Sequence, residues 1–334
     1  MEPVKWGIIS TAKIGLEKVI PAMQTQPLCD VAAIASRDLA TARAAADQLG
    51  IEKAYGSYEE LLADSAIEAV YNPLPGHLHV PWSVKAAEAG KHVLCEKPLS
   101  MDAAEALTLI EARDRAGVLI QEAFMVRTHP QWRRARELVR GGRIGDLRAI
   151  QGFFSYSNLD PANIRNIPEV GGGGVYDIGC YPITTCRYIF EAEPTRVVSL
   201  IEWDPVMKTD RLASAILDFP AGQASFTCST QLVPYQRMNI FGTEGRIEVE
   251  IPFNAPTAEP CKIFVDDGSD APSTSSAVTE TFETADQYAI QGQLFSQAIR
   301  SGEPLEFPLE NAVNNMRIID AVFRSAKSGG WETV

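Results

Sequence analysis

The chain has 334 residues, which exceeds the length at which a single hydrophobic core usually stops growing, so we expect two domains. An apolar fraction of 46% and a charged fraction of 22% are typical of a folded globular protein and argue against global disorder. The formal net charge of −13 disfavours nucleic acids and anionic membrane surfaces as partners, because like charges repel. The densest basic cluster is interpreted as the solvated face of a helix and comprises Arg127, Arg133, Arg134, Arg136, Arg140 and Arg143.

The six cysteines are scattered and form no C-x-x-C pair, which is typical of reduced thiols in a cytosolic protein. His77 and His79 form the one close histidine pair, and no cysteine lies near them in the sequence, so no metal site is predicted. The chain enters a strand at once, without a charged segment followed by an apolar one, and no apolar run reaches the roughly 20 residues that span a bilayer. We therefore expect no signal peptide, no membrane span and a cytoplasmic location.

Strands and helices alternate through the first third of the chain. The expected strands cover residues 5–9, 31–35, 68–71, 92–95 and 118–122, and the expected helices cover residues 14–24, 39–49, 81–89 and 102–116. Pro21 predicts a kink in the first helix, and Gly50, Gly90 and Gly117 follow the other three as C-terminal signals. Strands separated by such helices predict βαβ units and a doubly wound parallel sheet, a Rossmann domain over residues 1–123.

The pattern changes after about residue 124. A helix is expected over residues 130–140, followed by strands over 147–156, 196–203, 213–219, 224–232, 237–241 and 247–251, a polar mobile loop over 266–281, and helices over 287–300 and 310–327. Several strands alternate apolar and polar residues, which is typical of an antiparallel sheet with one covered face, and Gly242 and Gly245 predict a hairpin turn. We expect a C-terminal α+β domain over residues 124–334 with a large, mostly antiparallel open sheet, its last helix able to pack back on the first domain.

Small residues mark the turn between the first strand and the first helix. A dinucleotide-binding turn needs them, because the backbone must approach the pyrophosphate, whose charge rests on the helix N-terminus. The G-x-G-x-x-G fingerprint is present in altered form, as Ser10-x-Ala12-x-x-Gly15. The position of this motif at the first strand-to-helix junction favours a dinucleotide site over an ordinary tight turn.

Ser36 and Arg37 follow the second strand, where enzymes that prefer NAD carry an acidic residue for the ribose 2′-hydroxyl. A carboxylate would repel a 2′-phosphate, whereas a guanidinium pairs with phosphate in fork geometry. The pair therefore favours NADP over NAD, and an exposed loop arginine is the alternative interpretation. Asp38 is expected to cap the next helix.

Glu96-Lys97-Pro98 lies at the end of a strand, and ligands bind at the carboxyl ends of parallel strands in open α/β sheets. Proline pushes Lys97 out of helical geometry, so the lysine is expected in an extended turn at the mouth of the crevice. A structural turn lysine paired with Glu96 is the alternative.

Four consecutive glycines, Gly171 to Gly174, precede a polar and aromatic helical stretch that contains Asp177 and Tyr181. Ordering four glycines costs much backbone entropy, so they form either a flexible linker or a segment that must pass close to something. The helical stretch directly after them favours the second interpretation.

Together these motifs make the chain resemble the glucose–fructose oxidoreductase / inositol dehydrogenase (Gfo/Idh/MocA) family over essentially its whole length. Within the family it is similar to the branch of dimeric dihydrodiol dehydrogenases and NADP-dependent D-xylose dehydrogenases. The residues that carry the resemblance are 6–14, 35–38, 92–99, 122–130 and 177–181. Gly76 departs from the family, which usually has Asn three residues before the histidine that corresponds to His79, so one cofactor contact is expected to be missing.

The resemblance implies roles for single residues. The implied catalytic residues are Lys97, Tyr181 and Asp177. The implied cofactor-binding residues are Gly7, Ser10, Thr11, Ala12, Lys13, Ile14, Ser36, Arg37, Leu74, Pro75, His79, Glu96, Lys97 and Arg127. Lys97 is expected beside the nicotinamide ribose and the reacting carbon, and Tyr181 takes the position at which many relatives carry His.

The implied reaction is hydride transfer between the CH–OH group of a sugar or polyol and the nicotinamide. Tyrosine has an ordinary pKa of about 10, and a nearby ammonium lowers it, so Tyr181 is expected to act as general acid/base with Lys97 tuning its pKa. An aldose 1-dehydrogenase of the xylose or glucose type is expected first. A trans-dihydrodiol dehydrogenase, a sugar ketone reductase and a non-catalytic sugar- or dinucleotide-sensing regulator remain as alternatives. The resemblance also implies a homodimer, or a tetramer, that buries the open sheet face.

Overall fold

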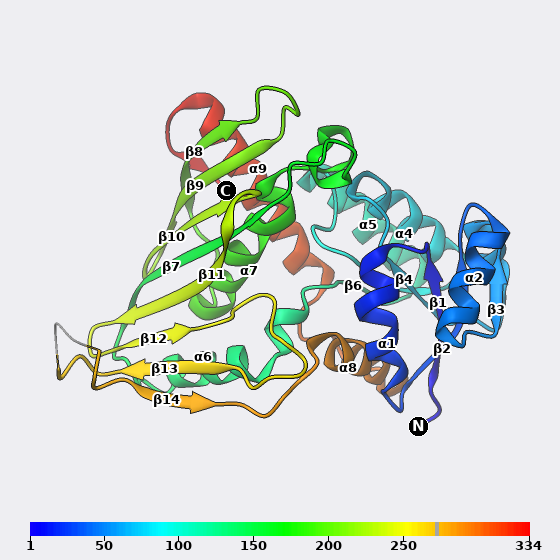
Figure 1. The fold of residues 1–334 in the computed structure, drawn as a ribbon, viewed down its shortest axis with the longest axis horizontal. Helices are drawn as coiled ribbons and strands as arrows, with labels where there is room; N and C mark the ends of the chain where they lie inside the picture. The colour runs from blue at the N-terminus through cyan, green and yellow to red at the C-terminus, as the bar shows by residue number, and fades with distance from the viewer. Residues whose placement is uncertain (271–273) are drawn as a thin grey trace. The chain divides into compact units, whose positions relative to one another are not determined.

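The structure is a computed structural model that describes residues 1–270 and 274–334 (Figure 1). The chain divides into two compact units, and each unit draws on two stretches of sequence. The first unit comprises Met1–Met125 and Tyr288–Met316, and the second comprises Val126–Gln287 and Arg317–Val334. The predicted fold class is confirmed, since the first unit holds a parallel sheet and the second a mostly antiparallel one.

The sheet of the first unit has six parallel strands in the order β3-β2-β1-β4-β5-β6. The strands are β1 (Val4–Ile9), β2 (Cys29–Ala35), β3 (Lys53–Tyr55), β4 (Ala69–Asn72), β5 (His92–Cys95) and β6 (Ile120–Glu122). The short β3 and the helix after it, α3 (Tyr58–Ala63), were not predicted, because three half-exposed residues give too little pattern to recognise a strand. The strand order reverses between β1 and β4, and in this architecture the crevice at that reversal binds ligands.

The remaining helices of the first unit are α1 (Ile20–Gln24), α2 (Leu39–Leu49), α4 (His79–Glu88), α5 (Ala103–Ala116) and α8 (Gln287–Ser301). The predicted helix over 14–24 differs in detail, since Gly15–Val19 forms a π-helical turn and the α-helix starts just before Pro21, whose missing N–H is tolerated at that position. Helix α8 belongs to this core, because the indole N–H of Trp6 donates to the Ser296 hydroxyl at 3.0 Å.

The sheet of the second unit has nine strands in the order β14-β13-β12-β11-β7-β10-β9-β8-β15. The strands are β7 (Leu147–Ser157), β8 (Arg196–Trp203), β9 (Asp210–Phe219), β10 (Gly222–Ser229), β11 (Gln231–Gly242), β12 (Arg246–Val249), β13 (Lys262–Asp266), β14 (Val278–Thr281) and β15 (Glu332–Thr333). The predicted hairpin is confirmed, with the Gly242 N–H donating to the Gly245 carbonyl at 2.8 Å.

Two sequence predictions for this sheet are corrected. The expected strand over 224–232 ends at Ser229, and β11 begins at Gln231, since Ser229 and Thr230 turn the chain between two strands. The expected loop over 266–281 contains β14 at its end, because the alternating Val278–Thr281 pairs with β13. Residues 271–273 of that loop lie outside the described residues.

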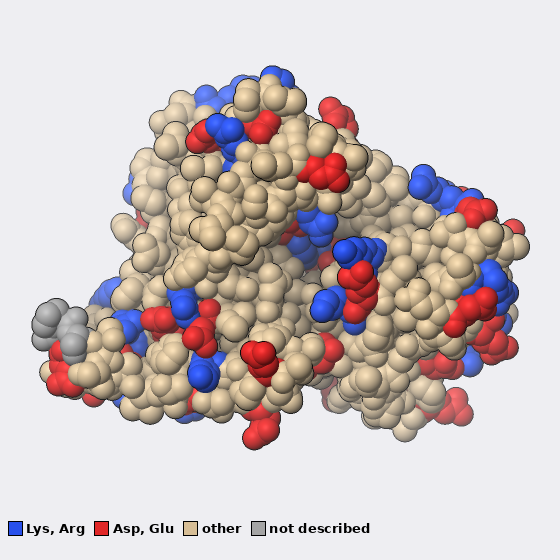
Figure 2. Space-filling model, viewed as in Figure 1, with Lys and Arg blue, Asp and Glu red and all other residues tan. Residues whose placement is uncertain are grey.

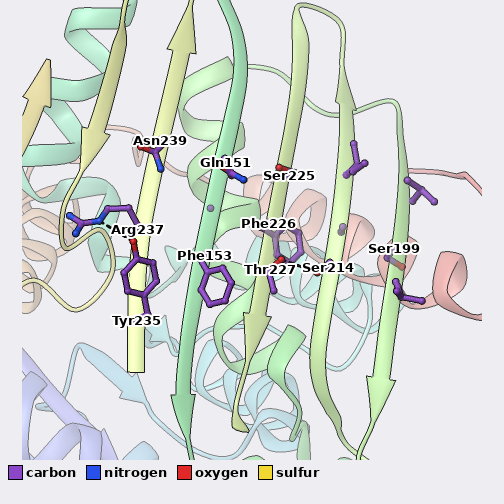
Figure 3. Close-up of a pocket in the computed structure, with 15 residues that line it drawn as sticks. Gln151, Phe153, Ser199, Ser214, Ser225, Phe226, Thr227, Tyr235, Arg237 and Asn239 are labelled. Carbon is purple, nitrogen blue, oxygen red and sulfur yellow. Dashed lines mark hydrogen bonds between the residues drawn. The ribbon is translucent and has the colours of Figure 1, made fainter. Parts of the chain in front are cut away.

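Helices α6 (Pro130–Arg140) and α7 (Cys180–Phe190) and residues 317–328 of α9 (Leu309–Ser328) cover one face of this sheet (Figure 1). On α9, for example, the Ser325 hydroxyl accepts the Ser199 N–H of β8 at 2.9 Å. On the opposite face, side chains from β7, β8, β9, β10 and β11 line a depression of about 520 Å³ (Figure 3). The predicted sheet with one covered face is therefore present.

On α6, Arg133 and Arg140 are exposed, as predicted for the solvated face of a helix, whereas Arg134 and Arg136 are half-buried. Arg134 pairs with Glu280, and both Arg136 and Arg140 pair with Glu191. Arg127 does not fit that prediction, because it is only 3% exposed. Figure 2 shows acidic and basic side chains interspersed over the displayed face. In the described part of the chain, no helix has the length and apolar character needed to cross a membrane.

Candidate active site

The turn after β1 is tight although Ser10 and Ala12 replace the first two glycines of a dinucleotide fingerprint. Ser10 has φ of 103°, a conformation that glycine adopts easily and that costs other residues about 1–3 kcal/mol. Its N–H donates to the Ala35 carbonyl at 3.0 Å, and its hydroxyl accepts the Ala12 N–H at 3.0 Å, which offsets part of that cost. Lys13, at the helix entry, has an exposed side chain. This turn leads into a helical N-terminus of the kind that binds phosphate.

Arg37 lies exposed directly after β2, while the neighbouring carboxylate is already engaged. Asp38 accepts hydrogen bonds from the Thr41 N–H at 2.8 Å and from the Thr41 hydroxyl at 2.7 Å, so the predicted helix cap is confirmed. The Ser36 N–H donates to the Tyr55 carbonyl at 3.1 Å and anchors the loop. The loop therefore presents a guanidinium, which suits a phosphate on the ribose.

The Glu96-Lys97-Pro98 turn is held on two sides by neighbouring strand ends. The Tyr71 hydroxyl of β4 donates to Glu96 Oε1 at 2.5 Å, and burial together with this carboxylate raises the pKa of Tyr71 well above its usual value. On the other side, the buried Glu122 of β6 accepts the Leu99 N–H at 2.9 Å. Lys97, at the centre of the turn, is half-buried and its peptide bond to Pro98 is cis.

His79 joins the loop after β4 to the Lys97 turn. Its Nε2 lies 2.6 Å from the Leu74 carbonyl oxygen and its Nδ1 lies 2.8 Å from the Pro98 carbonyl oxygen, with 2% of the residue exposed. Burial lowers the pKa of His79 to about 4, so the imidazole is neutral near pH 7 and donates to one of the two oxygens. Both ring nitrogens thus face main-chain atoms of this unit, and a direct cofactor contact by His79 stays a prediction.

The other predicted cofactor residues occupy varied positions. Gly7 lies within β1, and a Cβ there would come within 2.7 Å of a Leu61 methyl group, so packing already explains this glycine. Leu74 is buried, Pro75 precedes the 3-10 helix Gly76–Leu78, and Ile14 directly precedes the π-helical turn. Arg127 belongs to the second unit, on the 3-10 helix Met125–Thr128. Their contacts with a cofactor remain predictions.

In the second unit, a π-helical turn (Val175–Gly179) continues into α7 and carries both Asp177 and Tyr181. Asp177 Oδ2 accepts the Tyr156 hydroxyl at 2.6 Å and the Arg165 Nε–H at 3.2 Å. Asp177 raises the pKa of Arg165, and the nearby phenols of Tyr156 and Tyr181 act in the same direction. A carboxylate, a guanidinium and two phenols therefore gather at the start of one helix.

The Tyr181 side chain is largely buried among aromatic rings. It packs edge-on against Phe154, with centroids 5.7 Å apart, and at 5.5 Å from Phe253, and the residue is 6% exposed. Phe154 and Phe253 also stack on each other at 4.7 Å, so the three rings form one aromatic cluster. Among the other aromatic residues of this unit, Tyr156 reaches Asp177, whereas Trp132 is fully buried and donates to the Pro252 carbonyl at 2.7 Å.

Arg165 was not predicted as a functional residue. Arg165 lies in the loop after β7, on the 3-10 helix Ile164–Asn166, where sequence periodicity carries no information. Side-chain hydrogen bonds nevertheless hold this loop, since the buried Asn166 donates to the carbonyl oxygens of Asn158 and Asp160. The predicted catalytic residues divide between the units, with Lys97 in the first and Asp177 and Tyr181 in the second, and their joint action stays a prediction.

Comparison with known proteins assigns both units. Residues 4–124 match the family described as "Oxidoreductase family, NAD-binding Rossmann fold", and residues 132–248 match the "GFO/IDH/MocA C-terminal domain". The chain is 52% identical to the oxidoreductase ORF334 of Rhizobium meliloti, with 100% of both chains covered. It is 40% identical to the D-xylose 1-dehydrogenase (NADP(+)) 2 of Haloferax volcanii, covering 97% of this chain and 98% of that one.

Among solved structures, the chain is similar to KijD10, a 3-ketoreductase from Actinomadura kijaniata in complex with NADP and TDP-benzene. The TM-score is 0.90 at 30% identity, covering 97% of this chain and 98% of that one. The altered glycine turn, the Glu96-Lys97-Pro98 turn and the helix that carries Asp177 and Tyr181 thus occur in a fold shared along its whole length. The chain belongs to the GFO/IDH/MocA family of NAD-binding oxidoreductases.

Proposed function

We propose that the protein is an NADP-dependent oxidoreductase that acts on the CH–OH group of a sugar, with aldose 1-dehydrogenase activity of the xylose or glucose type. The observation that carries the proposal is the cluster around Asp177, where a phenol and a guanidinium converge on one carboxylate beside Tyr181. Paired donors and acceptors of this kind suit the adjacent hydroxyls of a sugar. The 40% identity with a D-xylose 1-dehydrogenase supports this choice of substrate class.

The residues of the first unit fit a phosphorylated dinucleotide. The Ser10 turn allows the close backbone approach that a pyrophosphate needs, and Arg37 offers a guanidinium to the 2′-phosphate while Asp38 caps α2. Bound NADP would accept or supply the hydride. The chain itself supplies the proton chemistry: Tyr181 takes the proton from the substrate hydroxyl during oxidation, Lys97 favours the phenolate, and Asp177 orients the neighbouring hydroxyls.

The test is the change in absorbance at 340 nm with NADP and NAD in parallel, against aldoses, polyols and trans-dihydrodiols. We expect turnover of aldopyranoses and a preference for NADP that Arg37→Asp reverses. Arg43→Asp, on α2, makes the same charge change and is the control, since Arg43 contacts the Glu52 carbonyl. Aldose turnover with no preference for NADP would refute the cofactor assignment, and no aldose turnover would refute the substrate assignment.

A sugar ketone reductase is the second candidate, favoured by the structural similarity to a 3-ketoreductase over 97% of the chain. A ketone reductase would oxidise NADPH in the presence of a keto-sugar nucleotide and would not turn over free aldoses. A trans-dihydrodiol dehydrogenase would respond to the diols of the same panel. A sensing regulator would bind NADPH and sugar without turnover.

We also propose that a second copy of the chain covers the open sheet face of the second unit. Figure 3 shows Phe153 and Tyr235 on neighbouring strands of this face, between polar side chains such as Thr227. Leu200 is 77% exposed and Ile216 is 41% exposed on the same face, and such apolar area seldom stays in water. Light scattering should give a dimer or tetramer that Leu200→Glu with Ile216→Glu dissociates, and a monomeric wild-type protein would refute the proposal.

A further inference from the structure

The four-glycine run is tightly packed rather than flexible. Gly171 and Gly173 have φ of 90° and 127°, which favour glycine. A Cβ on Gly172 would lie 2.6 Å from the Ile167 carbonyl oxygen, and a Cβ on Gly173 would overlap Oδ1 of Asp210. The run therefore passes between a loop and the side chain of Asp210, which explains why four small residues occur together.

Asp210 is a buried carboxyl at the start of β9, with 1% of the residue exposed. Its Oδ2 accepts the N–H of Val175 at 2.6 Å, and the Gly174 N–H also bonds to it. Val175 is the first residue of the helical segment, and the N-cap position before it is a glycine that has no side chain to cap with. The cap of this helix is thus supplied by a residue 35 positions later in the sequence.

The carboxyl has a high cost of burial, which the helix start offsets. Moving a carboxylate out of water is unfavourable unless hydrogen bonds replace its hydration, and helix N-terminal N–H groups are suitable donors. Burial raises the pKa of Asp210 to about 7, and the nearby Asp177 acts in the same direction. An asparagine would fill similar space without a buried charge and would still offer one acceptor oxygen to Val175, so stability alone does not explain an acid here.

We propose that Asp210 is a positioning residue that fixes the start of the helical segment 175–190 and thereby the places of Asp177 and Tyr181. This inference rests on the oxidoreductase function proposed above. Asp177 lies two residues after Val175 in the π-helical turn, and Tyr181 follows four residues later on α7. A π-helical turn holds more residues than an α-helical turn, so its relaxation would change the angle between the two side chains about the helix axis.

The test compares Asp210→Ala and Asp210→Asn with Asp204→Asn as matched control. Asp204 is also a buried acid of the second unit, and it accepts the N–H groups of Val206 and Met207 at 2.8 Å, in the turn between β8 and β9. We expect Asp210→Ala to lower kcat about 10- to 100-fold with the dissociation constant of NADPH changed less than threefold. Asp210→Asn keeps one acceptor for Val175 and should recover part of kcat, and Asp204→Asn should lower only the melting temperature.

A double-mutant cycle separates positioning from general destabilisation. In a background that lacks both the Tyr181 hydroxyl and the Asp177 carboxylate, Tyr181→Phe with Asp177→Asn, Asp210→Ala should cost less than threefold in kcat, because both groups that it positions are already missing. The loss of melting temperature should remain the same in both backgrounds. An undiminished kcat effect in that background, or a kcat effect equal to that of Asp204→Asn, would overturn the proposal.

Hydrogen exchange keeps the test independent of the substrate. We expect the amides of residues 174–176 to exchange at least tenfold faster in Asp210→Ala than in the wild-type protein, and Asp204→Asn to leave them unchanged. Unchanged exchange in Asp210→Ala would overturn the role of Asp210. Faster exchange in Asp210→Ala, found together with a wild-type protein that turns over no sugar, would reject the proposed function while leaving the cap in place.

Discussion

The two units hold their candidate catalytic side chains in different ways. In the first unit, Lys97 lies in a turn that is pinned by strand ends and by the imidazole of His79 against main-chain carbonyl oxygens. In the second unit, Asp177 is held by side chains from a strand and a loop, and its helix is capped by Asp210 from a third element. The side chains of His79 and Glu122 hold main-chain groups of the Lys97 turn, whereas Asp177 is itself bonded by the side chains of Tyr156 and Arg165, so a substitution at either of these changes the contacts of Asp177 directly. We therefore expect substrate specificity to vary mainly through the second unit.

The largest effect is expected at the two proton-handling residues, one in each unit. Tyr181→Phe keeps the ring that packs on Phe154 but removes the hydroxyl, and we expect kcat to fall about 10²- to 10⁴-fold. Lys97→Ala should fall within the same range. Steady-state kinetics with the best aldose measures both, and near-normal turnover of either variant would refute the assigned role.

A smaller effect is expected at Arg165, whose contact with Asp177 lies within the second unit. Arg165→Gln removes a charge-assisted bond to Asp177 and should lower kcat/KM for the sugar about 10- to 100-fold, since such bonds contribute about 1.5–3 kcal/mol. The dissociation constant of NADPH should not change. Arg148→Gln, which breaks a surface pair with Asp146, is the control. Equal losses in both variants would contradict a role in sugar binding.

A substitution at His79 tests the contacts that hold the Lys97 turn in the first unit. His79→Gln cannot bridge the Leu74 and Pro98 carbonyl oxygens in the same way, so we expect kcat to fall roughly tenfold, the equivalent of about one hydrogen bond. His92→Gln is the matched control, because His92 accepts the Leu119 N–H at 2.8 Å away from the Lys97 turn. In a Lys97→Ala background the effect of His79→Gln should disappear, and persistence there would argue against positioning of Lys97.

The pH dependence of stability tests the buried cap of the second unit. With its pKa raised to about 7, Asp210 keeps a proton in the folded protein that the unfolded chain releases above about pH 4. Its contribution to stability is therefore present at low pH and is lost as the pH rises through 7. Thermal melts from pH 5 to 8 should show the wild-type protein losing stability relative to Asp210→Asn, and parallel curves would contradict the raised pKa.

The smallest effect is expected at the strained turn of the first unit. Ser10→Gly relieves a φ of 103° but removes the hydroxyl that accepts the Ala12 N–H, so the two changes largely cancel. We expect the free energy of unfolding to change by less than about 1 kcal/mol and NADPH affinity to stay within threefold. A tenfold loss of affinity would show that the serine hydroxyl itself takes part in binding.

The same contrast explains what the sequence could predict. In the first unit, the candidate cofactor-binding and catalytic turns follow directly after strands whose apolar runs are easy to recognise, so Ser10, Arg37 and Lys97 could be located from local pattern. In the second unit, the contacts of Asp177 come from residues 21 and 12 positions earlier, and the cap of its helix comes from a residue 35 positions after Val175. The spacing of apolar residues carries no information about such long-range contacts. In the sequence analysis, the run of four glycines was the feature that pointed to a close approach in this region.

The first unit consists of two stretches of chain that are synthesised far apart in time. Residues 288–316 belong to it, although they are synthesised after almost the whole second unit. Until they emerge from the ribosome, the indole of Trp6 lacks its partner Ser296, and Glu68 lacks the guanidinium of Arg300. The dinucleotide-binding unit begins first and is completed nearly last, so a fragment that stops at residue 125 would expose the surface that α8 covers.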